Sequence, residues 1–411
     1  MALLWGAFCV WASPAHTESL WEFPMSAGYD LYVHDYFLAD SDTIEVIQEF
    51  NFTASAQGTS AWGSKNRWFL RAGLSGGTEL FRQSLDTGFR LRGDDRHEWL
   101  RGDLLVLARQ FREDSEYSLS SDNVEGRGIL ATSPWANDDV GLELRARGRF
   151  VDYADPSTLE VSYRDGAAGA YLRSPYGSFR RWNVGGLLTA RDYTDSNEIN
   201  REGFIVEGDY DHGALEGEFR AFHRTERRNI EDETARPSAW FHWTEATSAI
   251  PADAAEVVLR ASSEVWDYDQ AVGAWYDSWL VSGEAGGRWG DPFKARYEAL
   301  LALGFLDAGD EPETYSQAGV RLGVESLAGR FSGSASVEVG HRWYKDSLDS
   351  ADDLVLDYSD YAYFALWIMA NWRINDHFST DLSLNYEPEN HTERDDNVTL
   401  GFASLRLVWR P

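Results

Sequence analysis

Apolar and polar residues alternate with a period of two along most of the chain beyond residue 43. In 140–150 the even positions run from Val140 to Phe150 and are apolar or small. The odd positions of this segment from 143 onward are charged: Glu143, Arg145, Arg147 and Arg149. The segments 44–56, 331–341 and 378–386 alternate in the same way. This period is that of a β-strand with one apolar and one polar face, and no helical stripe interrupts it, so the pattern predicts an all-β protein.

We expect about 16 to 20 strands, most of them roughly ten residues or longer. The clearest lie near 43–56, 66–78, 98–112, 138–153, 179–192, 200–226 (a hairpin), 255–268, 272–288, 291–307, 312–327, 329–345, 357–374, 377–388 and 396–409. The stretch 113–178 is ambiguous, because Pro134, Pro156 and Pro175 interrupt short segments and proline cannot donate to a central ladder.

The connections between these segments alternate between tight and long. Tight links fall at 290–292, 327–330 and 375–376, whereas longer acidic links fall at 192–201, 226–236, 307–313, 345–357 and 387–397. Short turns at one end and long polar loops at the other are typical of a transmembrane barrel between two compartments. The sequence therefore predicts an antiparallel up-and-down transmembrane β-barrel. Both termini are expected in the periplasm, and the loops 345–357 and 387–397 outside the cell.

The polar face of these strands is expected to line a lumen. A packed soluble barrel would show the same alternation with its apolar face inside, but a large membrane barrel turns that face to lipid. Both signs of charge occur at close spacing on the polar face, and charges on neighbouring strands can pair in water. The predicted lumen-lining residues are Glu143, Arg145, Arg147, Arg149, Glu218, Arg220, Arg296, Glu298, Arg321, Glu325, Glu338 and Arg342.

Two further features belong to this interpretation. Arg145, Arg147 and Arg149 form a basic ladder, and Glu218, Glu298, Glu325 and Glu338 would create a transverse field if they face it across the pore. Aromatic residues gather near strand ends, as in the interfacial girdles of membrane barrels. These residues are Trp266, Tyr268, Trp289, Phe293, Trp343, Tyr344, Tyr361, Tyr363, Trp372, Phe378, Tyr386 and Trp409.

Composition excludes several classes of protein. The 411 residues include 37 Lys+Arg against 68 Asp+Glu, and so few dispersed cations predict no nucleic-acid partner. One cysteine excludes a disulfide scaffold and a thiolate metal cluster. An apolar run before Ala15 predicts a signal peptide over 1–15, with a buried strand as the alternative. We then expect a short periplasmic segment at 16–42 and the barrel at 43–411.

The C-terminal segment resembles the closing hairpins of Gram-negative outer-membrane β-barrel proteins. The resemblance rests on YFALWIMANW (363–372), RINDH (373–377), FSTDLSLNY (378–386) and GFASLRLVW (401–409). Such barrels typically finish on an aromatic residue that the outer-membrane assembly machinery reads, which assigns that signal to Trp409, although Arg410 and Pro411 follow it. The resemblance implies an outer-membrane location, with lipid and lipopolysaccharide as partners.

The sequence carries no zinc-protease motif. It lacks H-E-x-x-H, and we expect no enzyme, no cofactor and no catalytic metal site. Acidic residues in 346–357 and 387–396 could hold Ca²⁺ or Mg²⁺, but they match no calcium-loop spacing and favour solvated loops or shared divalent ions with lipopolysaccharide.

Two functional hypotheses remain open. The first is a porin-like passive channel or export conduit for polar solutes, and the segment 16–42 is too short for the folded plug of an active transporter. The second is a sealed barrel that serves as a sleeve or anchor for a periplasmic or secretion partner. A pore that conducts would separate them.

Overall fold

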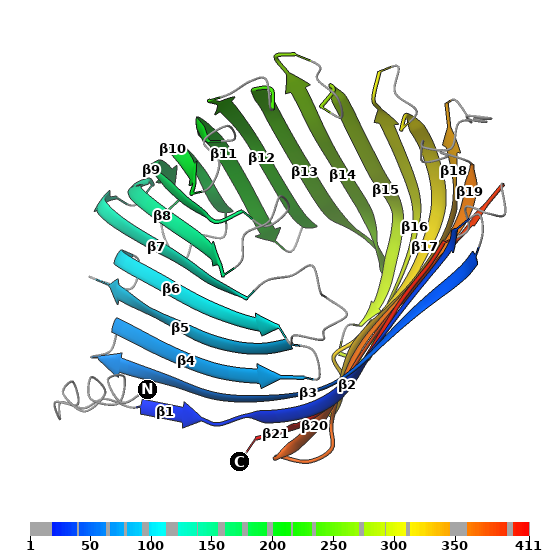
Figure 1. Ribbon diagram of the computed structural model, residues 1–411, viewed down its shortest axis with the longest axis horizontal. Coiled ribbons are helices and arrows are strands. Elements are labelled where there is room, and N and C mark those ends of the chain that lie inside the picture. Colours follow the sequence, from blue (N-terminus) through cyan, green and yellow to red (C-terminus); the bar gives the residue numbers. More distant parts are fainter. Residues whose placement is uncertain are drawn as a thin grey trace.

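The chain forms one antiparallel β-sheet that closes on itself (Figure 1). The computed structural model describes residues 19–38, 41–62, 66–77, 80–92, 98–111, 122–137, 139–154, 161–174, 180–194, 200–214, 217–231, 236–270, 275–291, 293–309, 313–345, 360–392 and 398–410. Among these residues, no helix is long and apolar enough to cross a membrane.

Strands β3 to β21 follow one another round the wall in chain order, each pairing with the next. They are β3 (Ser41–Trp62), β4 (Asn66–Gly76), β5 (Leu80–Arg92), β6 (Glu98–Phe111), β7 (Asn123–Ala136), β8 (Gly141–Tyr153), β9 (Tyr163–Arg173), β10 (Arg180–Tyr193), β11 (Arg201–Ala214), β12 (Gly217–Ile230), β13 (Ala239–Ala252), β14 (Ala255–Tyr268), β15 (Ser278–Asp291), β16 (Ala295–Asp307), β17 (Tyr315–Ser326), β18 (Phe331–Tyr344), β19 (Tyr361–Arg373), β20 (Phe378–His391) and β21 (Val398–Trp409).

The barrel closes through the N-terminal strands. Strands β1 (Ser19–Glu22) and β2 (Met25–Leu38) lie end to end along β3, and β2 also pairs with β21. Counting β1 and β2 as one position, the described chain has twenty wall strands, within the predicted range. The predicted periplasmic segment at 16–42 is wrong for 25–38, because without this strand the edges of β3 and β21 would leave backbone groups unpaired in lipid. Residues 1–18 lie outside the described part, so the signal peptide stays a prediction.

The ambiguous stretch 113–178 contains three regular strands, β7, β8 and β9. Pro134 lies in β7 where the register with β8 shifts between Thr132 and Trp135. A bulge accommodates a proline because the extra residue needs no ladder hydrogen bond. This irregularity interrupts the alternation of apolar and polar residues in β7.

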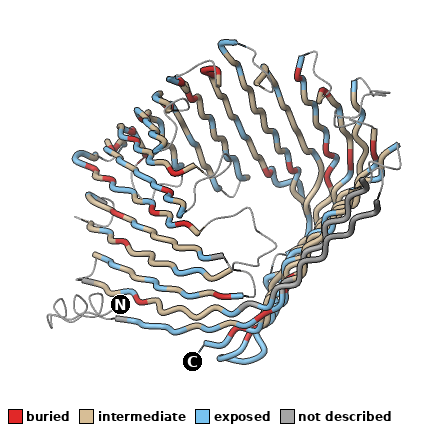
Figure 2. Tube along the Cα trace, viewed as in Figure 1, coloured by how far each residue is buried: buried red, intermediate tan, exposed pale blue. Residues whose placement is uncertain are grey.

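The apolar face of the strands is the outer face. Large apolar side chains on it are half exposed, such as Leu130 (51%) and Val339 (55%). On the opposite face Arg145 of β8 reaches Glu207 of β11, three strands away, which only the concave side of a barrel allows. Figure 2 shows buried positions scattered along the wall without a central core. Exposed apolar residues outside and charges inside are the arrangement of a membrane barrel.

The two ends of the barrel differ in their connections. The end that carries both Met25 and Trp409, here called the short-turn end, has tight turns such as the one between Ala252 and Ala255. Gly290 and Gly329 adopt positive φ angles in two others, a conformation that a β-carbon disfavours. From β6 onward the opposite long-loop end carries the longer connections, as predicted. The β2–β3 and β4–β5 hairpins are short even at that end.

Candidate functional site

The inner face of the barrel carries all of the predicted lumen-lining residues. Glu143, Arg145, Arg147 and Arg149 alternate along β8, Glu218 and Arg220 lie on β12, Arg296 and Glu298 on β16, Arg321 and Glu325 on β17, and Glu338 and Arg342 on β18. Their registers agree, since each pair lies directly opposite on neighbouring strands: Arg296 with Glu325 and Arg321 with Glu338. The register therefore groups these side chains on one face of the sheet, and their role in lining an open pore stays a prediction.

Strands β14 to β18 form what we call the paired wall. Four arginines on it each bind a carboxylate, and Arg342 is the exception among the arginines predicted to line the lumen there. Arg260 holds Glu284 and Glu298, both at 2.8 Å, and Arg321 holds Glu338 at 2.6 Å. Further pairs join Arg296 to Glu325 at 2.8 Å and Arg288 to Glu256 at 2.6 Å. The charges are neutralised along the wall.

This pairing corrects the predicted transverse field. Strand β18 lies ten strands from β8 and so across the barrel from the basic ladder. Glu298, Glu325 and Glu338 nevertheless each bind an arginine of a neighbouring or next-neighbouring strand. A carboxylate with a guanidinium at hydrogen-bond distance contributes little field at the far wall. Sequence alone could not show this, because the pairing partners depend on strand register.

The arginines of the basic ladder on β8 also differ in their partners. Arg145 binds Glu143 at 2.8 Å and lies over the ring of Tyr171, 4.0 Å from its centroid. Tyr171 in turn donates a hydrogen bond to Glu207 at 2.6 Å. Arg145 is thus part of a packed network that braces the wall.

The centre of this network is Glu143, whose side chain is only 4% exposed. Besides Arg145, it contacts Arg101 at 3.1 Å and Arg173 at 3.6 Å. Three guanidinium groups around one buried carboxylate offset its desolvation. We call Glu143, Arg101, Arg145 and Arg173 the Glu143 cluster.

Arg147 differs from the arginines on either side of it. Arg149 binds Glu125 of β7 at 2.9 Å, whereas Arg147 forms no ion pair with any described residue. Arg127 of β7, which the sequence analysis did not single out, also lacks one within the described chain. Its signal was available, since Arg127 shares the inward parity of Glu125 on the same strand.

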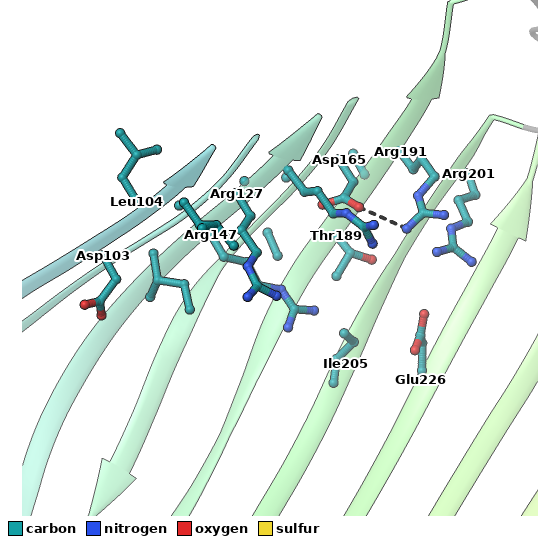
Figure 3. Close-up of a pocket in the computed structure, with 18 of the residues that line it drawn as sticks. Asp103, Leu104, Arg127, Arg147, Asp165, Thr189, Arg191, Arg201, Ile205 and Glu226 are labelled. Carbon is teal, nitrogen blue, oxygen red and sulfur yellow. Dashed lines mark hydrogen bonds and ion pairs between the residues drawn. The ribbon is translucent and has the colours of Figure 1, made fainter. Parts of the chain in front are cut away.

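Arg127 and Arg147 line a cavity of about 610 Å³ on the inner wall between β4 and β12. Figure 3 shows their guanidinium groups lying beside each other and pointing into it. Arg191 on the far side is bound to Asp165 at 2.9 Å, and Arg201 lies next to it. The cavity is lined by more arginines than carboxylates, which makes it an electropositive region of the wall.

Several of the aromatic residues predicted for interfacial girdles face inward instead. Trp289, Trp343, Trp372, Phe378, Tyr386 and Trp409 lie at outward register positions. Trp266, Tyr268, Tyr344, Tyr361 and Tyr363 lie at inward ones, near the long-loop end. Phe293 lies in a turn between β15 and β16. Parity could have separated the two sets, because Trp266 shares the face of Arg260 and Glu264.

The inward aromatic residues stack with arginines. The guanidinium of Arg228 lies 4.6 Å from the ring centroid of Trp266, and that of Arg342 lies 4.1 Å from the ring of Tyr315. Cation–π contacts of this kind stabilise the inner side chains of a single-layer wall, which has no second layer of apolar residues to pack against. Within the described residues they lie near the long-loop end on β8–β14 and again on β17–β19.

No metal site stands out in the described chain, where no group of three His, Cys, Asp or Glu residues could hold an ion. The acidic loop residues 346–357 and 393–396 lie outside the described residues, so the preference for solvated loops there stays a prediction.

No protein-family model matches the sequence, and no curated protein is significantly similar to it. The fold is similar to those of several solved structures. The iron transporter FrpB from Neisseria meningitidis gives a TM-score of 0.61 at 9% identity, over 95% of this chain and 81% of that one. The copper transporter OprC gives 0.55 at 11% identity, over 97% and 80%. OccAB4 from Acinetobacter baumannii gives 0.50 at 10% identity, over 95% and 98%.

The fold and the apolar outer face together define the class. The chain is a closed antiparallel β-barrel, as predicted from its sequence, and its fold is similar to those of Gram-negative outer-membrane β-barrel proteins. This fold agrees with the predicted location in the outer membrane.

Proposed function

We propose that this barrel is a passive channel for polar solutes across the outer membrane, with a preference for anions. The observation that carries the proposal is the state of the inner charges. They pair along the wall over at most three strands, as in Arg145 with Glu207, and the arginines of the cavity exceed its carboxylates. Charges held against the wall are compatible with a wet lumen, and an excess of cations on it attracts anions.

The test is conductance of the purified barrel in a planar bilayer, with the reversal potential measured in a KCl gradient. We expect an open channel that prefers chloride. Arg90→Glu, on the inner face of β5, should shift the reversal potential toward cations. The matched control is Arg164→Glu, which makes the same charge change at an outward position of β9 and should leave selectivity unchanged.

Each outcome of this experiment decides between the hypotheses. A barrel that inserts but never conducts would favour the sealed sleeve for a periplasmic or secretion partner. A channel whose selectivity ignores Arg90→Glu would contradict the assignment of anion preference to the inner wall.

The proposal extends to partners outside the lumen. We infer that the half-exposed apolar outer face contacts lipid and lipopolysaccharide, and that Trp409 at the end of β21 is read by the outer-membrane assembly machinery. Trp409 lies at an outward position beside Met25 and Phe378, where a partner at the seam of the barrel could reach it. Trp409→Ala should lower the amount of folded barrel in the membrane, measured by its heat-modifiable mobility on gels.

A further inference from the structure

Arg127 and Arg147 have no carboxylate partner among the described residues, a property that they share with Arg90 and Arg201 among the arginines that line the cavity. On the same two strands, Arg145 binds Glu143 and Arg149 binds Glu125. The wall therefore supplies acidic partners at this level of the barrel, but not to these two. Neither residue makes an ion pair with any other described residue.

The register of β7 and β8 brings these cations together. Arg127 lies directly opposite Arg149, and Ile129 lies opposite Arg147, so Arg127 and Arg147 are diagonal neighbours. Diagonal neighbours in an antiparallel pair are about 7–8 Å apart at Cα, within reach of long side chains. Like charges at this spacing repel, and an anion between them would offset that repulsion.

The cavity supplies space for such an anion. It measures about 610 Å³, and Figure 3 shows both guanidinium groups pointing into it. The inward acidic groups of the cavity do not compete for them, and Glu202 lies at an outward position of β11. Asp165 is bound to Arg191 at 2.9 Å, Glu226 is bound to Arg224 at 2.6 Å, and Figure 3 shows Asp103 directed away from the pair. Asp86 lies further along the wall on β5.

We propose that Arg127 and Arg147 form a binding site for the oxyanion group of a solute in transit, that is, a carboxylate, phosphate or sulfate. Two guanidinium groups offer planar forks of donors that match the oxygens of such a group. The site rests on the proposed channel function, because it names the class of solute that the lumen selects. The cavity is large enough to hold a solute the size of a sugar phosphate or a tricarboxylate.

The test is binding of inorganic pyrophosphate and of citrate to the purified full-length barrel in neutral detergent, by isothermal titration calorimetry at low ionic strength. Sucrose serves as the uncharged comparison. We expect both anions to bind and sucrose not to bind. The affinity of the double variant Arg127→Gln with Arg147→Gln should be at least about tenfold lower, because the loss of a hydrogen bond to a charged group weakens binding by about that factor. The outcome with citrate against pyrophosphate shows whether carboxylate or phosphate is preferred.

The matched control is Arg288→Gln with Arg296→Gln on the paired wall. It removes the same charge, but each arginine there already binds a carboxylate, so we expect affinity within about twofold of the unaltered protein. Arg127→Lys with Arg147→Lys keeps the charge and loses the fork, and should weaken binding while leaving the reversal potential unchanged. This variant also serves if the glutamine pair fails to fold.

Two results would overturn the site: unchanged affinity in both the glutamine and the lysine pair, or an equal loss in the control on the paired wall. The calorimetry does not need an open pore. Binding without conductance would keep the site and refute the channel, whereas anion-selective conductance without binding would do the reverse.

Discussion

The inner walls of β4–β8 and of β14–β18 carry the same types of charged side chain but use them differently. On the paired wall Arg260, Arg288, Arg296 and Arg321 all hold glutamates at 2.5–2.8 Å. On the arginine-rich wall of β4–β8, Glu143 and Glu125 gather several arginines each, and others remain without an ion pair in the described chain. The charges of the paired wall neutralise one another, whereas the arginine-rich wall retains positive charge that a solute can bind. The difference shows that pairing, and not the number of charges, decides where a barrel can select.

The largest expected effect is at the Glu143 cluster. Glu143→Gln leaves three arginines around a buried neutral amide, and breaking a buried pair in this way costs about 3 kcal/mol or more. Glu284→Gln on the paired wall, where the carboxylate is more exposed and has two arginines, should cost about half as much. Urea unfolding in detergent measures both. Equal losses would mean that the two walls do not differ in burial.

The outer faces of the two walls should behave alike. Leu130→Arg on β7 and Val339→Arg on β18 each place a charge in lipid near mid-strand, at a cost of about 2–4 kcal/mol. Ser336→Arg, at an inward position of β18, should be mild by comparison. If the inward change were as damaging as the outward ones in the same unfolding assay, the inside would be a packed core.

A smaller effect distinguishes unpaired from paired arginines. Arg147→Gln removes repulsion from Arg127 and should leave stability unchanged or raise it slightly. Arg321→Gln strands Glu284 and Glu338 and should cost about 1 kcal/mol, since its partners are partly screened by water. The midpoints of urea unfolding give the sign. A loss in Arg147→Gln as large as in Arg321→Gln would show that Arg147 has a structural partner.

The smallest effect is on salt dependence. The screening length falls from about 10 Å in 0.1 M salt to about 3 Å in 1 M salt. Anion preference that arises from the unpaired arginines should therefore weaken as salt rises in both chambers at a fixed gradient ratio. Selectivity that persists unchanged in 1 M KCl would point to a steric filter instead.

Much of the fold could be predicted from alternation, and two of the strands that the alternation did not reveal share a cause. The strand β9 is rich in small residues, from Gly166 to Ala170, so its two faces differ little in hydropathy. Outward positions of β13 include Thr244 and Ser248, which weaken the apolar face in the same way. A period-two pattern marks a strand only where its two faces differ in chemistry.

The candidate site could be predicted by face but not by partner. Parity placed Arg145 and Arg147 inside, yet the pair Arg145–Glu207 joins strands that are three apart in the wall. Such contacts depend on barrel curvature and register, which a single strand does not encode. The distinction between a bracing arginine and one left for a ligand is therefore a property of the closed structure.

The seam between β2 and β21 has a consequence for the order of assembly. Most neighbouring strands of the wall are also consecutive in the chain, whereas the β2–β21 ladder pairs Met25 with Trp409. The entropy cost of closing a loop grows as about (3/2)RT ln n with its length, and non-local pairing slows folding. The seam is thus the slowest contact to form, and the sheet has two open edges until the last strand arrives. Folding rate, in contrast to final stability, should respond most to changes along these two strands.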